Sequence, residues 1–170
     1  APKIVASLIA AICAVHAPAF SQMSRPEYGI KFDIPEPGSF IRREAVRGSK
    51  IPINKKYADL TSEEREIVRG WYENVGVNDE PPFPSEGLKP VLDKFRKIQE
   101  ALLVDGELYL IATVSPTGQV TEVKAFGSPS ADMVKFASAV VLLTKFKPGV
   151  CAGIQCQMDF PFNQRFRTEQ

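Results

Sequence analysis

The last third of the chain switches twice between strand-like and helix-like spacing, and this pattern is the strongest constraint on its fold. Residues 107–114 alternate between two faces of an extended chain, with an apolar residue at every second position from Leu108 to Val114. Ser115-Pro-Thr-Gly118 follows, in which the proline suits a tight turn and the glycine is free to take a positive φ. The segment therefore predicts a strand that ends in a hairpin.

Three further elements are expected after this hairpin. A second strand covers residues 119–126, with a bulge or strong twist where its alternation is imperfect. A broad apolar stripe at helical spacing predicts a helix over residues 131–146. The last strand covers residues 157–166, and Pro161 places it at the edge of the sheet because proline cannot donate to a ladder. The predicted fold class is α+β, with a small antiparallel three-stranded sheet (strand-strand-helix-strand) packed by helices.

Two helices are expected before this unit. Thr61 and Glu64 have the spacing of a capping box, which predicts a helix over residues 62–74. Trp71, the only tryptophan, is interpreted as the core anchor of that helix rather than as a ligand platform. The second helix starts near Leu88, carries a proline in its first turn, and shows apolar residues at helical spacing. It is amphipathic and is expected to pack on the sheet.

The N-terminal residues have the order of a secretory signal. Lys3 is followed by a twelve-residue apolar run and then by small residues that predict cleavage after Ser21. The alternative is an uncleaved membrane anchor, although spanning a bilayer takes roughly 20 apolar residues. The predicted organisation is a signal peptide over 1–21, an irregular extension over 22–60, a helix and Pro-rich linker over 61–86, the sheet domain over 87–166 and a tail over 167–170.

The cysteines fit an exported protein. Cys13 lies in the predicted signal, which leaves Cys151 and Cys156 as an even pair and favours a disulfide between them. Closing so short a loop stabilises the fold by about 2 kcal/mol. A redox-active pair is the alternative, but the spacing is not Cys-x-x-Cys. A metal site would need more ligands than these two thiols supply.

Catalytic patterns are missing from the sequence. The single histidine, His16, lies in the predicted signal, so the remaining chain cannot build a Ser-His-Asp or Cys-His site. No glycine-rich phosphate motif is present, and a net charge of +1 gives no reason to expect nucleic-acid binding. We therefore predict no catalytic, cofactor-binding or metal-binding residues. A hydrolase that uses two carboxylates is the alternative, and it would show an apolar pocket with two close acids of raised pKa.

Residues 107–166 resemble the C-terminal domain family of TonB-type energy transducers. The matching features are Pro116-Thr-Gly118, Val120-Thr-Glu-Val-Lys124, Gly127-Ser128, Phe146-Lys-Pro148 and Asp159-Phe-Pro-Phe162. The resemblance implies a small antiparallel sheet with helices on one face. It also implies a periplasmic protein of the Gram-negative envelope that binds extended segments of envelope proteins, such as outer-membrane transporters.

In that family the last strand is the usual edge for strand addition, which uses free backbone N–H and C=O groups. The resemblance therefore implies a partner-binding edge made of Gln157, Met158, Asp159, Phe160, Phe162 and Gln164. The alternative function is a membrane-anchored energy transducer for transport across the outer membrane, located at the periplasmic side of the inner membrane. That alternative requires a retained N-terminal segment and a long Pro-rich spacer, and the spacer is missing.

Overall fold

The computed structural model describes residues 41–48 and 50–168, and within them it is a mixed α+β fold with four helices and several antiparallel sheets. The predicted signal peptide over 1–21 and the extension up to residue 40 lie outside the described residues. No helix in the described ranges is long and apolar enough to cross a membrane.

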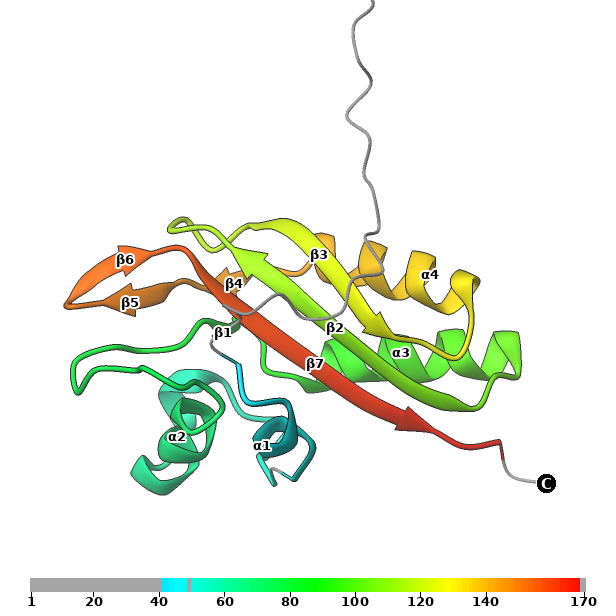
Figure 1. Cartoon of the computed structure of the whole chain (residues 1–170), viewed down its shortest axis with the longest axis horizontal. Coiled ribbons are helices and arrows are strands. Elements are labelled where there is room, and N and C mark those ends of the chain that lie inside the picture. The colour runs from blue at the N-terminus through cyan, green and yellow to red at the C-terminus, as the bar shows by residue number, and fades with distance from the viewer. Residues whose placement is uncertain (1–40, 49, 169–170) are drawn as a thin grey trace, which may run out of the picture.

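The elements follow one another as Figure 1 shows. The helices are α1 (Arg43–Gly48), α2 (Ser62–Arg69), α3 (Lys89–Leu102) and α4 (Ala131–Leu142), with a short 3-10 turn η1 (Tyr57–Asp59). The strands are β1 (Phe83–Pro84), β2 (Gly106–Val114), β3 (Val120–Gly127), β4 (Phe146–Lys147), β5 (Gly149–Cys151), β6 (Ile154–Cys156) and β7 (Met158–Phe166).

The main sheet has three antiparallel strands in the order β3-β2-β7. The β2–β7 register is continuous from the Gly106–Phe166 pair to the Val114–Met158 pair. The β2–β3 register shifts at two points, which confirms the irregularity predicted for the second strand. β7 lies at an edge of this sheet, as its proline indicates.

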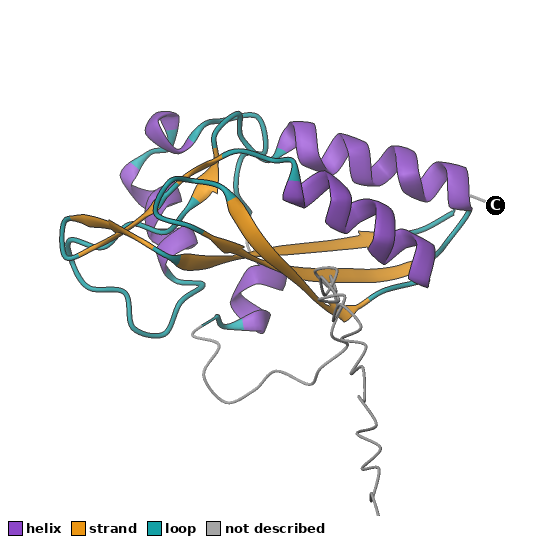
Figure 2. Cartoon of the chain, turned by 90° about the horizontal axis from the view of Figure 1, so that it is seen from above, coloured by secondary structure: helices purple, strands orange, loops and turns teal. Residues whose placement is uncertain are grey.

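The two long helices form one layer against this sheet. Figure 2 shows α3 and α4 side by side on one face, with the short helix α1 on the other side. On one face of β2, Leu108, Leu110, Ala112 and Val114 are all fully buried. Phe160 and Phe162 of the edge strand β7 are buried beside them. The core therefore lies between the sheet and the α3–α4 pair.

The capping box predicted for α2 is present. Thr61 Oγ1 accepts from the Glu64 N–H at 3.2 Å, and a Glu64 carboxylate oxygen accepts from the Thr61 N–H at 2.8 Å. The helix ends at Arg69 rather than at residue 74, because the chain turns at Gly70 and carries Trp71 into the core. Tyr72 then forms a β-bridge with Ile41. The interpretation of Trp71 as a core anchor is confirmed by its burial and by its ring contact with Phe160.

The predicted helix over residues 131–146 is too long at its C-terminal end. Helix α4 ends at Leu142, and Phe146–Lys147 is strand β4, paired with β1. The N–H of Phe146 donates to the Gly118 C=O at 2.9 Å, a contact with the β2–β3 turn that the helix could not make. The sequence pattern missed this because the β1 partners lie more than 60 positions away in the chain and Gly118 lies 28 positions away.

The segment predicted as a Pro-rich linker is not a surface connection. Residues 81–84 are all buried, and Phe83 stacks edge-on against Phe160 with ring centroids 5.8 Å apart. The buried core runs through the described chain from Ile41 to Phe166. Residues 41–48 and 50–86 therefore belong to the same packed unit as the sheet, and they lie beside β7 (Figure 1).

Candidate functional site

The free side of β7 is the feature that most directly suggests binding. In an antiparallel pair, successive residues direct their N–H and C=O groups alternately toward and away from the partner strand. Pro161 pairs with Ile111 of β2 and has no N–H to donate, so its backbone belongs to the outward set. Asp159, Asn163 and Arg165 share this parity, and their backbone groups also point away from β2.

One position of this outward set is already occupied. The Tyr72 hydroxyl donates to the C=O of Asp159 at 2.8 Å. Burial, followed by the nearby Asp159 carboxylate, raises the pKa of Tyr72 well above its usual value, so the hydroxyl keeps the proton that it donates. The beginning of β7 is therefore covered by the segment that follows α2.

The centre and end of β7 are open. None of the described residues hydrogen-bonds to the N–H of Asn163 or Arg165, or to the C=O of Pro161 or Asn163. The C=O of Arg165 accepts only from the neighbouring Gln164 side chain, at 3.3 Å. A row of unpaired donors and acceptors along an edge strand is a template for pairing with another extended chain. Residues 161–165 therefore form the part of β7 that can accept an added strand.

Two adjoining cavities, of about 200 and 310 Å³, follow this part of β7. They share Ile53, Leu92 and Gln164, so they form one continuous groove, which we call the β7 groove. Its first part is lined by Val46, Arg47, Ile51, Ile53, Trp71, Leu88, Leu92 and residues 161–164, and its second part by Ile53, Leu92, Asp93, Arg96, Gln99 and residues 164–167.

The structure separates the residues named as the binding edge into two groups. Phe160 and Phe162 are 0% and 2% exposed, and by parity their backbone groups point toward β2. Their side chains therefore belong to the core. Gln157, Met158 and Asp159 line a different cavity of about 410 Å³ at the start of β7, while Gln164 lines the β7 groove.

The sequence reasoning did not name Pro161, Asn163 or Arg165, although their backbone groups face outward. Pro161 was the signal that could have found them, because every second residue from a proline in an edge strand points its backbone the same way. The walls of the groove could not have been found in this way, since they come from residues between Val46 and Gln99, far from β7 in the chain.

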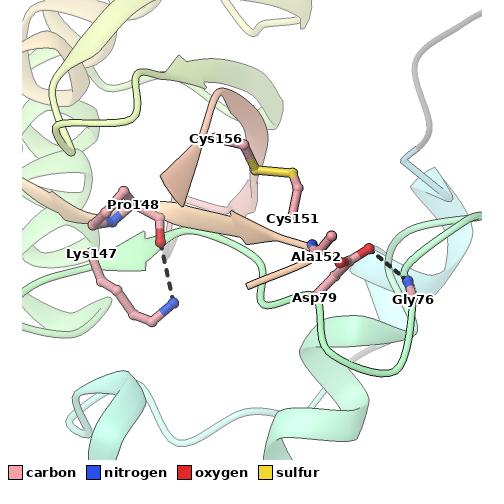
Figure 3. The surroundings of a disulfide bond; sticks show 7 residues. All are labelled: Gly76, Asp79, Lys147, Pro148, Cys151, Ala152 and Cys156. Atoms are coloured by element: carbon pink, nitrogen blue, oxygen red, sulfur yellow. Dashed lines mark hydrogen bonds between the residues drawn. A yellow bond between two sulfur atoms is a disulfide. The ribbon is translucent and has the colours of Figure 1, made fainter. Parts of the chain in front are cut away.

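Cys151 and Cys156 are joined by a disulfide bond that crosses the β5–β6 hairpin just before β7, with Cα atoms 5.8 Å apart (Figure 3). The turn of this hairpin is held by Asp79. Its carboxylate accepts from the N–H of Ala152 at 2.7 Å and from the N–H of Gly76 at 2.8 Å. The bond from Ala152 ties the loop after α2 to the hairpin that leads into β7, while the bond from Gly76 lies within that loop.

The two hydrogen bonds, that from Ala152 first, hold the pKa of Asp79 below its usual value. The stabilisation is therefore complete above the unfolded-state pKa, near 3.8, and is lost as the pH falls through the lower folded-state pKa. We expect Asp79→Ala to lower the melting temperature at neutral pH, and this difference from the wild type to vanish in acid. Thermal denaturation of both proteins, followed by circular dichroism from neutral to acidic pH, measures this difference in melting temperature. Glu73→Ala, which removes an exposed carboxylate nearby, is the control and should show no such pH dependence.

A polar cavity of about 370 Å³ is lined by Tyr57, Ser62, Arg65, Glu66, Arg69 and residues 77–80. The pKa of Asp79 in this cavity is lowered, as is that of Glu64, where the bond from Lys55 is the main cause. Within residues 41–48 and 50–168, no group of three or more His, Cys, Asp or Glu residues could hold a metal ion.

No protein-family model matches the chain, and no curated protein matches it.

Proposed function

We propose that this protein is an interaction module of the TonB C-terminal type, which binds an extended segment of a partner protein by strand addition to β7. The observation that carries the proposal is the stretch of β7 over residues 161–165, where the outward N–H groups of Asn163 and Arg165 and the C=O groups of Pro161 and Asn163 have no partner among the described residues. Main-chain hydrogen bonds would supply affinity, and the adjoining groove would supply selectivity for side chains.

The structure around this edge suits a binding role. The β5–β6 hairpin is fixed by the disulfide and by Asp79, and β7 pairs with β2 over its whole length. A rigid edge reduces the entropy that is lost when a partner strand is ordered on it. Tyr72 covers the first outward carbonyl, which limits an added strand to the second half of β7.

The signal-like N-terminus, the disulfide and the resemblance to TonB C-terminal domains favour a periplasmic location and a partner in the bacterial envelope. An outer-membrane transporter is one such partner. The proposal does not require that the chain be coupled to an inner-membrane motor.

The test removes one outward N–H without touching the bonds between β7 and β2. The full chain is first incubated with a synthetic random heptapeptide library, and retained peptides are identified by mass spectrometry. Asn163→Pro is then expected to weaken binding of the best retained peptide at least tenfold, measured by fluorescence anisotropy, because one main-chain hydrogen bond and the fit beside it are lost.

Asn163→Ala is the matched control. It removes the same side chain, including its bond to Glu107, but keeps the backbone N–H, so peptide affinity should stay close to that of the wild type. Circular dichroism checks that both variants remain folded. Equal affinities of the two variants would contradict strand addition, and a library that yields no retained peptide would contradict the proposal altogether.

A further inference from the structure

We infer that the β7 groove selects extended peptide segments that carry a carboxylate close to an apolar residue. This inference rests on the proposed function and specifies the chemistry of the partner. It follows from two features of the groove: Ile53, Leu88 and Leu92 line its first part, and the guanidinium groups of Arg165 and Arg167 line its second part.

The first part of the groove offers apolar contacts next to the open backbone groups. Leu88 and Leu92 come from the N-terminal end of α3, and Ile53 comes from the loop before η1. Ile53 is 43% exposed and lines both parts, so its side chain lies where they join. A strand paired with residues 161–163 would place alternate side chains on this side.

The second part carries an excess of positive charge. Arg96, Arg165 and Arg167 line it together with a single carboxylate, that of Asp93. Asp93 is already paired with Lys89 at 2.7 Å and with Arg96 at 3.3 Å. Arg165 and Arg167 are exposed and have no acidic partner within 4 Å among the described residues.

Such an arrangement favours a carboxylate over other ligands. A guanidinium group pairs with a carboxylate through two parallel hydrogen bonds, which gives both charge and geometric selectivity. Arg165 supplies both an outward-pointing backbone N–H and one of the two guanidinium groups. A peptide residue that accepts a hydrogen bond from this N–H therefore has neighbouring residues close to the side chains of Arg165 and Arg167. The carboxylate can come from an Asp or Glu side chain or from a peptide C-terminus.

The library experiment tests this directly. Heptapeptides are prepared with free and with amidated C-termini and are selected on the full chain. We expect retained peptides to contain Asp or Glu close to an apolar residue, or to be retained only with a free C-terminus. The first result identifies a side-chain carboxylate and the second a terminal one. Retained peptides that bind through the edge but show no enrichment of either carboxylate would overturn the inference and leave the proposed function standing.

Variants of the chain give the second measurement. The double variant Arg165→Gln/Arg167→Gln is expected to weaken binding of a retained acidic peptide at least tenfold, and to leave its neutral amide analogue unaffected. Lys94→Gln/Lys97→Gln is the control, because these exposed lysines of α3 do not line the groove and the net charge changes equally. An equal loss in both double variants would indicate general charge attraction and would overturn the inference.

The apolar part is tested in the same way. Ile53→Ser is expected to weaken peptide binding at least fivefold, whereas Ile67→Ser should have no effect. Ile67 is a suitable control because it is 37% exposed, close to the 43% of Ile53, but lies on α2 and lines neither part of the groove. Unchanged binding in Ile53→Ser would remove the apolar part of the inference.

Discussion

Replacing Phe160 with alanine is expected to lower the free energy of unfolding by about 3–5 kcal/mol, the usual cost of deleting a buried aromatic ring. Phe160 is fully buried in β7, and its ring contacts those of Trp71, Phe83, Phe146 and Phe162 at centroid distances of 5.1 to 5.8 Å. The loss is a large share of the 5–15 kcal/mol typical of a domain.

Urea unfolding followed by Trp71 fluorescence measures this loss, since Trp71 packs edge-on against Phe160. Thermal denaturation should show a midpoint lower by roughly 6–20 °C. Phe136→Ala on α4 is the control, because Phe136 is 45% exposed and its replacement should change stability far less. If Phe160→Ala does not fold, Phe160→Leu keeps much of the apolar volume and should give a smaller loss. Equal stability of the Phe160→Ala and Phe136→Ala variants would contradict the assignment of Phe160 to the centre of the core.

Replacing Gly118 with alanine is expected to destabilise the fold by about 3 kcal/mol or more. Gly118 has φ of +79°, which alone costs an L-residue about 1–2 kcal/mol. In addition, a Cβ at this position would lie 2.1 Å from the backbone oxygen of Phe146. The Phe146 N–H also donates to the Gly118 C=O, so the β2–β3 turn cannot move away from β4 without losing that bond.

Gly153→Ala is the matched control for this prediction. Gly153 has φ of +84° in the β5–β6 turn, but nothing lies within 4 Å of a Cβ built there. It should therefore show only the cost of the left-handed backbone, about 1–2 kcal/mol. Chemical denaturation of both variants measures the difference between them, which isolates the clash with Phe146. Equal losses would show that the turn and β4 can separate without cost.

The turn at Gly118 illustrates what a local sequence pattern can and cannot predict. Ser115-Pro-Thr-Gly118 predicts a turn with a glycine at positive φ, and the structure has one. The sequence gives no indication that β4 packs on that turn, because β4 is created by its pairing with β1. The helix predicted through residue 146 was wrong for the same reason. Local spacing favoured continuation of the helix, and contacts with distant residues ended it at Leu142.

The candidate site shows the same division. Pro161 was sufficient to predict that the last strand lies at an edge, because the missing N–H is a property of one residue. Phe160 and Phe162 were named as edge residues, yet their side chains pack in the buried aromatic cluster. The groove itself depends on residues before position 93, which the sequence reasoning had assigned mainly to an irregular extension and a linker.

The sequence by itself determined the elements whose signals are local: the capping box at Thr61, the start of α3, the hairpin at Gly118 and the antiparallel three-stranded sheet. Tertiary structure alone decided which backbone groups of β7 remain open. The bond from Tyr72 to Asp159 joins residues 87 positions apart and covers one end of the edge. Periodicity and capping depend on residues a few positions apart. Whether an edge strand is covered depends on where a segment distant in the sequence packs, and a local sequence pattern carries no information about that packing.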